Sequence, residues 1–215
     1  MPIIVPSILT SEIEDFTKKL GQIETFPDVS MIHVDFADNK FVPNWTIMPA
    51  NVPALPIKYI FAGHLMCVSP KVYLEDLQRA GFEIVAFHFE ALASSEEIVA
   101  IASEIKNRGM KPQLAVNPDT PIEDIIPFIN YFDYIHIMTV HPGFYGGKYE
   151  PNGEERVKYL RSRNFYGTIS VDGGIDKSRV KGLVAAGADH LVVGSAIFKL
   201  GIPTQNYLEI KQELG

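Results

Sequence analysis

Four side chains that can bind a metal ion or carry a proton stand at or near the ends of apolar segments. His33 and Asp35 are two residues apart, while His64 and Asp172 each close a separate apolar run. Residues two apart in a strand point to the same side of the sheet. Imidazole nitrogens combined with carboxylates suit Zn, Fe(II), Mn or Co better than Mg or Ca. If the four converge, the sequence predicts a site for one divalent metal ion.

Three other histidines are less well placed to bind metal or transfer a proton. His88 also ends an apolar run, and we assign it to packing or to hydrogen bonding behind the ligands in preference to ligation. His136 lies in the middle of its run and His190 begins one, so both are assigned structural or surface roles. A single buried histidine is more often a hydrogen-bonded core group than a metal ligand.

Glycine clusters follow the last three apolar runs, in 142–147, 172–174 and 194–198. Consecutive glycines let backbone N–H groups turn toward an anion, and barrel enzymes often hold phosphate in the loops after their last two strands. Together the three clusters predict a phosphate cradle. Local donors of this kind are what an acidic chain needs to hold an anionic ligand.

Short apolar runs alternate along the chain with segments of helical period, which is typical of strand-helix units with a parallel sheet. The predicted strands are 3–5, 31–36, 57–65, 83–88, 113–116, 134–138, 168–171 and 190–193. The predicted helices are 11–24, 70–80, 95–108, 122–129, 153–163, 177–186 and 205–213. Segment 44–56, which is rich in proline, is expected to be loop.

Eight strands with their connecting helices in 215 residues predict an α/β fold, a (β/α)8 TIM barrel forming one domain over residues 1–215. The alternative is an open doubly wound sheet. That architecture usually carries a glycine-rich first turn, and here Pro6, Ser7, Ile8 and Leu9 stand in its place. The barrel is therefore favoured.

Composition limits the classes of function. The 19 basic and 26 acidic residues give a formal net charge of −7, which does not suggest a nucleic-acid-binding surface. No apolar run approaches the roughly 18 residues of a membrane span, and no basic segment precedes the apolar start, so neither membrane insertion nor export is expected. The single cysteine, Cys67, fits a reducing compartment, and the expected location is the cytoplasm.

Seven motifs, in the same order, resemble the ribulose-phosphate 3-epimerase family over nearly the whole chain. They are Pro6-Ser7-Ile8-Leu9, His33-Val34-Asp35 with Phe41-Val42-Pro43-Asn44, His64-Leu65-Met66, Asn117-Pro118-Asp119-Thr120-Pro121, Met138-Thr139-Val140-His141-Pro142-Gly143-Phe144, Val171-Asp172-Gly173-Gly174-Ile175 and Gly194-Ser195-Ala196-Ile197-Phe198. Seven ordered motifs are far more specific than any one glycine turn.

The resemblance implies a barrel enzyme of the pentose phosphate pathway that interconverts D-ribulose 5-phosphate and D-xylulose 5-phosphate. It implies a metal held by His33, Asp35, His64 and Asp172, with Asp35 and Asp172 transferring the C3 proton through an enediolate. It further implies that a small phosphorylated ketose is bound by Ser7, His64, Met66, Met138, Gly143, Phe144, Tyr145, Gly146, Gly173, Gly174, Gly194 and Ser195. Phe144 lies on a loop that resembles a lid.

The chain departs from the family pattern beside the reacting atoms. Where the family usually reads Met-Asp-Gly-His, this chain has Ala37, Asp38, Asn39 and Lys40, and the lid reads Gly143-Phe144-Tyr145-Gly146-Gly147 where Gly-Phe-Gly-Gly-Gln is usual. These changes bear on substrate fit more than on the metal ligands. Ala37 leaves room for a larger sugar, so an allulose-6-phosphate 3-epimerase, or another ketose-phosphate 3-epimerase, is the nearest alternative.

Two further alternatives come from other classes of protein. A paralogue that binds a sugar phosphate without turning it over is disfavoured because Asp35 and Asp172 are both present. A decarboxylase or aldolase-type barrel is disfavoured because no lysine ends any of the eight runs. Relatives in the family are commonly oligomeric, so the resemblance also implies a homo-oligomer.

Overall fold

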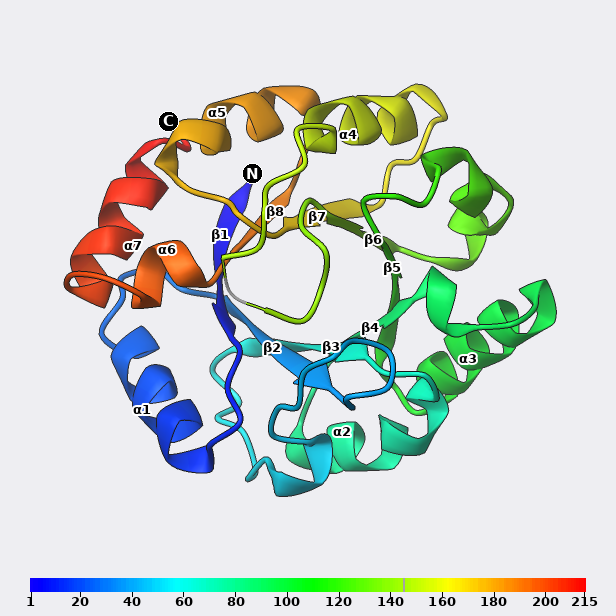
Figure 1. The fold of residues 1–215 in the computed structure, drawn as a ribbon, viewed down its shortest axis with the longest axis horizontal. Coiled ribbons are helices and arrows are strands. Elements are labelled where there is room, and N and C mark those ends of the chain that lie inside the picture. The colour runs from blue at the N-terminus through cyan, green and yellow to red at the C-terminus, as the bar shows by residue number, and fades with distance from the viewer. Residues whose placement is uncertain (145) are drawn as a thin grey trace.

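Eight parallel strands form a closed barrel in the part of the chain that the computed structural model describes, residues 1–144 and 146–215 (Figure 1). Each strand pairs with the next along the chain, and the last pairs with the first. The predicted (β/α)8 fold is therefore confirmed. The strands are β1 (Ile3–Ile8), β2 (Met31–Ala37), β3 (Ile60–Met66), β4 (Ile84–His88), β5 (Lys111–Val116), β6 (Tyr134–Met138), β7 (Thr168–Asp172) and β8 (His190–Val193).

Helices form a ring outside the strands (Figure 1). The α-helices are α1 (Ile13–Ile23), α2 (Leu74–Ala80), α3 (Ser95–Asn107), α4 (Gly153–Ser162), α5 (Lys177–Ala186), α6 (Ser195–Phe198) and α7 (Pro203–Gln212). Short 3-10 segments are η1 (Pro49–Asn51), η2 (Pro70–Tyr73), η3 (Phe89–Ala91) and η4 (Ile122–Tyr131). Within residues 1–144 and 146–215, none of the helices combines the length and the hydrophobicity that a bilayer-spanning segment needs.

Helix α3 shows how local sequence sets an element. The side chain of Ser94 accepts a hydrogen bond from the amide of Glu97, which satisfies one of the free N–H groups of the first turn. The helix buries Ile98, Ile101 and Ile105 at three- and four-residue steps against the strands. Full burial of each such side chain contributes about 1.5–3 kcal/mol, so the apolar face holds the helix on the barrel.

Several elements differ in their bounds from the sequence prediction, and for two of them the reason can be identified. Segment η4 is a 3-10 helix because Pro127 lies inside it, and proline lacks the N–H donor and clashes with the preceding turn. Strand β3 begins at Ile60, since Ile57 is fully exposed in a turn closed by a hydrogen bond from the Tyr59 amide to the Pro56 carbonyl. The apolar character of Ile57 therefore predicts strand at a position where the chain forms an exposed turn.

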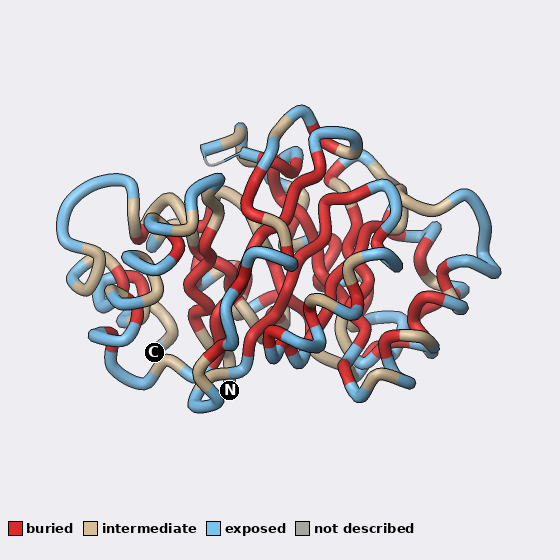
Figure 2. The backbone as a smooth tube through the Cα atoms, turned by 90° about the horizontal axis from the view of Figure 1, so that it is seen from below, coloured by how far each residue is buried: buried red, intermediate tan, exposed pale blue. Residues whose placement is uncertain are grey.

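The strands are buried on both faces, as expected for a parallel sheet covered by helices (Figure 2). Their outward side chains pack beneath the helices in the main core. Their inward side chains fill the barrel, where Val5, Met31, Ala62, Ile84 and Val192 form a separate apolar cluster that begins with Met31 and Ile84 at the amino ends of β2 and β4. The opposite, carboxyl end of the barrel carries the candidate site, as is usual for this fold.

Candidate metal centre and substrate pocket

The four residues predicted to bind metal come together inside the carboxyl end of the barrel. Asp35 and His64 stand opposite each other in the register of β2 and β3, and His64 Nδ1 lies 2.9 Å from Asp35 Oδ1. His33 Nε2 lies 3.1 Å from Asp35 Oδ1 and 3.6 Å from Asp172 Oδ2. Both carboxylates therefore lie within 4 Å of one imidazole nitrogen, although they are 137 positions apart in the chain.

His136 belongs to this cluster, which the sequence analysis missed. One ligand atom each from His33, His64, His136 and Asp172 lie within 4.8 Å of one another. His136 is fully buried, and its Nε2 lies 3.1 Å from Asp172 Oδ2. The predicted structural or surface role of His136 is therefore incomplete, and the spacing of residues in the strand could have indicated its position. Met138 was expected to face the substrate, and a residue two positions earlier in a strand points the same way.

Small side chains in the neighbouring strands leave room for the rings. Four of the imidazoles in the barrel each stand beside a buried alanine in the sheet register, so large and small residues alternate around them. These positions pair His33 with Ala62, His64 with Ala86, and both His88 and His136 with Ala115. The sequence thus builds a space for several rings, where bulky aliphatic residues would otherwise close the barrel.

The donor set fits a divalent transition metal. Three imidazoles and two carboxylates meet in a buried volume, and nitrogen donors of this kind favour Zn, Fe(II), Mn or Co. His136 Nδ1 has no hydrogen-bond partner among the described residues, although it is buried. A cluster of ionisable groups this far from water needs either mutual hydrogen bonds or a cation, and the groups here are placed for both.

The charge state of the cluster follows from burial and mutual contact. Burial by itself raises the pKa of Asp35, but the neighbouring imidazoles of His33 and His64 outweigh it and hold that pKa well below its usual value. Burial lowers the pKa of His136 to about 3, so this ring is neutral near pH 7. Asp35 is therefore an ionised carboxylate that lies between His33 and His64.

His88 lies behind the cluster. Its Nε2 is 2.8 Å from Nε2 of His64, and its Nδ1 is 3.2 Å from Oε2 of Glu90. Burial lowers the pKa of His88 to about 4, which makes it a neutral ring at pH 7. It makes the kind of hydrogen bonds that the sequence analysis preferred for it over ligation.

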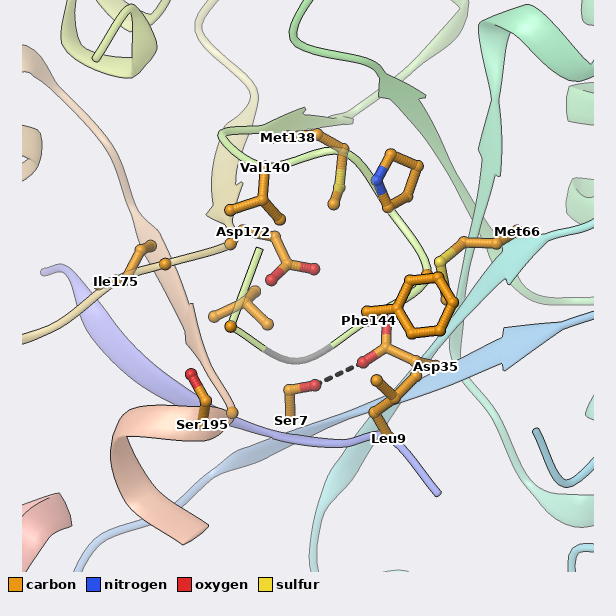
Figure 3. A pocket seen from close by; sticks show the side chains of 17 residues that line it. Ser7, Leu9, Asp35, Met66, Met138, Val140, Phe144, Asp172, Ile175 and Ser195 are labelled. Carbon is orange, nitrogen blue, oxygen red and sulfur yellow. Dashed lines mark hydrogen bonds between the residues drawn. The ribbon is translucent and has the colours of Figure 1, made fainter. Parts of the chain in front are cut away.

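A pocket opens directly above the cluster, and Asp35 and Asp172 point into it from facing walls (Figure 3). The hydroxyl of Ser7 donates a 2.6 Å hydrogen bond to Asp35 Oδ2. Of the residues predicted to contact substrate, those lining this pocket are Ser7, Met66, Met138, Gly143, Phe144, Gly146, Gly173, Gly174, Gly194 and Ser195. His64 lies below, in the metal cluster, and Tyr145 lies outside the described residues.

The loop between β6 and α4 crosses the mouth of the barrel (Figure 1). Its start is tied to the loop after β2, because the side-chain amide of Asn44 donates to the carbonyl of Gly143. Gly143 has a φ of 113°, and a Cβ there would lie 3.0 Å from the side chain of Val42. Phe144 beside it is half exposed. The position of this loop is that of a cover over the pocket.

The glycine pair after β7 fits tightly under the same loop. Gly173 has a φ of 108°, and a Cβ there would lie 2.4 Å from a methyl group of Val140, so only glycine fits without displacement. The Gly173 carbonyl accepts a hydrogen bond from the Thr139 hydroxyl, and the Gly174 carbonyl accepts one from Arg179. These bonds fix the backbone beside the predicted phosphate cradle.

The departures after β2 are accommodated by Asp38. Its carboxylate accepts hydrogen bonds from the amides of Lys40, Phe41 and Val68, which joins the loop after β2 to the end of β3. Asn39 takes the left-handed conformation that glycine would take more readily, with a φ of 56°. Ala37 is fully buried and packs with Met66 and Val42 at the edge of the pocket. Gly147, which stands where the family usually has glutamine, is half-buried, and a Cβ there would lie 3.2 Å from Val140.

Comparisons with known proteins find relatives of this chain over most of its length. Residues 3–198 match the model of the ribulose-phosphate 3 epimerase family. The ribulose-phosphate 3-epimerase of Schizosaccharomyces pombe is 35% identical over 207 residues, covering 94% of this chain and 89% of that protein. The cytoplasmic isoform from Oryza sativa subsp. japonica is 33% identical over 205 residues, covering 93% and 89%. The fold also matches 3-hexulose-6-phosphate synthase from Salmonella typhimurium, with a TM-score of 0.69 at 14% identity over 98% of this chain and 97% of that one.

Proposed function

Because the chain belongs to the ribulose-phosphate 3-epimerase family, and is thus an isomerase, we propose that it interconverts D-ribulose 5-phosphate and D-xylulose 5-phosphate. One observation carries the proposal. Asp35 and Asp172 line the same pocket, and both lie within 4 Å of His33 Nε2. Two carboxylates on facing walls are the arrangement that proton transfer to either face of one carbon requires.

His33, Asp35, His64 and Asp172 would hold the metal, and the position of His136 adds a further nitrogen at the same point. A divalent cation bound there supplies positive charge against which negative charge on the C2 and C3 oxygens of the substrate can develop. The ligand set suits Zn, Fe(II), Mn and Co.

Proton transfer is the work of the two aspartates. One carboxylate takes the proton from C3, which is acidified by the neighbouring C2 carbonyl, and electrons from the C–H bond form an enediolate. The other aspartate, protonated at that stage, returns a proton to the opposite face of C3. Asp35 is ionised near neutral pH, as a base must be.

The remaining pocket residues would orient the sugar phosphate. Ser7 holds Asp35 through its hydroxyl hydrogen bond, which fixes the direction of that carboxylate. Met66 and Met138 supply apolar surface next to the reacting carbons. The glycines after β6, β7 and β8 would receive the phosphate through backbone amides, and the loop carrying Phe144 would exclude water from the enediolate.

A six-carbon ketose phosphate, as in allulose-6-phosphate 3-epimerase, is the second candidate substrate. It is favoured by Ala37, which lies in the cluster with Met66 that borders the pocket. A longer side chain at this position would occupy space beside the substrate. The protein would act on a small phosphorylated ketose in either case, and we propose that it does so in the cytoplasm as a homo-oligomer.

The test is metal analysis of the purified protein coupled to exchange of the C3 proton. Ribulose 5-phosphate incubated with the protein in deuterium oxide should gain deuterium at C3 and form xylulose 5-phosphate, and a chelator should stop both. Stoichiometric Zn, Fe, Mn or Co is expected in the protein. Absence of exchange with both ribulose 5-phosphate and allulose 6-phosphate, with metal bound, would reject epimerisation.

A further inference from the structure

A row of hydrogen bonds leads from the metal cluster to the outer side of the barrel. His64 Nδ1 faces Asp35 and the cluster, His64 Nε2 meets His88 Nε2 at 2.8 Å, and His88 Nδ1 meets Glu90 Oε2 at 3.2 Å. His64 and His88 are fully buried, whereas the Glu90 side chain is 20% exposed and borders a recess between η3, α3 and η4. The row therefore connects a buried ligand to a carboxylate at the rim.

The second oxygen of Glu90 is also occupied. Glu90 Oε1 accepts a 2.8 Å hydrogen bond from the backbone amide of Asn117 and a 2.5 Å bond from the hydroxyl of Thr120. The amide of Asn117 can only donate, so the group that faces it must be an acceptor. Both carboxylate oxygens of Glu90 are thus placed as hydrogen-bond acceptors. A carboxylate can accept at both positions, whereas a neutral amide accepts at one and donates at the other.

The row fixes the tautomer of each ring in turn. A neutral imidazole has one donor nitrogen and one acceptor nitrogen. Because Glu90 accepts, His88 Nδ1 must carry the hydrogen, and His88 Nε2 is then an acceptor. His64 Nε2 must therefore donate to it, which leaves a free electron pair on His64 Nδ1, the atom that faces Asp35 and the cluster.

We propose that Glu90 and His88 are positioning residues, which present the Nδ1 electron pair of His64 to the metal by setting the tautomers of two rings in series. The inference rests on the proposed function, because it requires that His64 bind a metal. Neither residue lines the pocket above the cluster. Metal-bound histidines generally donate their other N–H to an acceptor, and here that acceptor is a second imidazole aligned by a carboxylate.

Orientation of the rings supports the same role. The ring centroids of His64 and His88 are 4.9 Å apart with an interplanar angle of 27°, and Phe41 packs on His88 at 4.8 Å. Phe41 follows the strand that carries His33 and Asp35. Packing therefore restricts rotation of the His88 ring. The hydrogen bond to Glu90 then determines which ring nitrogen of His88 carries the hydrogen.

Glu90→Gln tests the inference with almost no change of shape. If the new NH2 group faces Asn117, it meets another N–H donor. If it faces His88, it forces the hydrogen onto His88 Nε2, and His64 Nδ1 then carries a hydrogen and cannot bind metal. We expect the affinity for Zn, measured by competition with a chelator, to fall about 10- to 100-fold. The visible absorption of the Co-loaded protein should also change.

Glu123→Gln is the matched control. Glu123 borders the same recess, is exposed, and loses the same charge, but it is not among the residues bonded to His88 in the described chain. Its Zn affinity should stay within about twofold of the unmodified protein. Equal losses in Glu90→Gln and Glu123→Gln would overturn the proposal, because charge alone would then explain them.

If Glu90→Gln does not fold, two variants at His88 test whether an acceptor for His64 Nε2 is needed for metal binding. His88→Gln retains a side-chain oxygen that can accept the hydrogen of His64 Nε2, whereas His88→Leu leaves that donor buried without an acceptor. Zn affinity should fall further in His88→Leu than in His88→Gln, by about tenfold.

Unchanged Zn affinity and an unchanged Co spectrum in Glu90→Gln, or equal affinities in the two His88 variants, would overturn the role of the row while leaving the metal site intact. Failure of the unmodified protein to bind Zn or Co would instead remove the proposed metal function itself, and the inference with it. Measuring the unmodified protein first separates the two results.

Discussion

The two ends of the barrel are built from the same strands but serve different purposes. At the amino ends of β2 and β4 the inward side chains are the apolar Met31 and Ile84. At the carboxyl end the inward side chains of the same strands are His33, Asp35 and His88, which are titratable. On β2, Met31 of the apolar cluster and His33 of the metal cluster are only two positions apart. Apolar packing and titratable groups are thus divided along β2 and β4, and a change at one end of these strands need not disturb the other.

The two ends also differ in the free-energy cost of burying their side chains. Buried charges and imidazoles at the carboxyl end must hydrogen-bond to one another or bind a cation, because desolvation makes an unpaired group costly. The apolar cluster at the amino end carries no such requirement and stabilises the closed barrel. This division predicts that substitutions at the two ends will separate activity from stability.

The largest effect is expected from the carboxylates. Asp172→Asn and Asp35→Asn should each slow exchange of the C3 proton by about 10³-fold, because an amide cannot take or return a proton. The free energy of unfolding should change by less than about 2 kcal/mol, since asparagine keeps the shape of the side chain. Deuterium uptake followed by NMR, together with urea denaturation, measures both. Exchange at the normal rate in both variants would eliminate the two-aspartate mechanism.

At the amino end a substitution is expected to lower stability while leaving activity nearly unchanged. Ile84→Ala should lower the free energy of unfolding by about 2–4 kcal/mol through lost burial and the cavity left behind, while kcat/KM of the folded protein stays within about twofold. Ile57, which is fully exposed, provides the control, and Ile57→Ala should leave stability nearly unchanged. A large loss of activity in folded Ile84→Ala would show that the two ends are coupled.

The pH dependence of stability offers a third test. Burial lowers the pKa of His190 to about 4, whereas the same histidine in the unfolded chain titrates near its ordinary value of about 6.5. Between these pH values the unfolded state binds the extra proton, so this contribution to stability is lost as pH falls from about 6.5 to about 4.

His190→Leu should therefore flatten the fall in unfolding free energy between pH 7 and pH 4.5 by about 2 kcal/mol. Urea denaturation at several pH values measures the slope. His141→Leu is the control, because the His141 side chain is 63% exposed. An identical slope in His190→Leu and the unmodified protein would show that this ring gains its proton without unfolding.

The smallest expected effect concerns substrate choice. Ala37→Met should fill space beside Met66 and shift the ratio of kcat/KM toward ribulose 5-phosphate over allulose 6-phosphate by about tenfold, or 1.4 kcal/mol. Kinetics with both sugars on both proteins measures the shift. A ratio unaltered by the methionine would show that Ala37 does not set the size of the sugar.

Much of the fold was predictable because its signals are local. Apolar runs separated by helical period gave the order of strands and helices, and parity within β2 placed His33 and Asp35 on one face. Failures were also local: Pro127 turned a predicted α-helix into a 3-10 helix, and the apolar Ile57 lies in an exposed turn. The sequence does not single out His136, because a histidine in the middle of an apolar run is more often a hydrogen-bonded core group than a metal ligand.

The sequence by itself determined which residue types alternate along each strand, and therefore which side chains face inward and which ends carry glycine. Only the tertiary structure decided which of those inward groups touch, because contact depends on the register between strands that are far apart in the chain. Register placed Asp35 opposite His64 and put Ala115 between His88 and His136. It also joined Glu90 through two rings to the cluster, a hydrogen-bonded connection that no local pattern encodes.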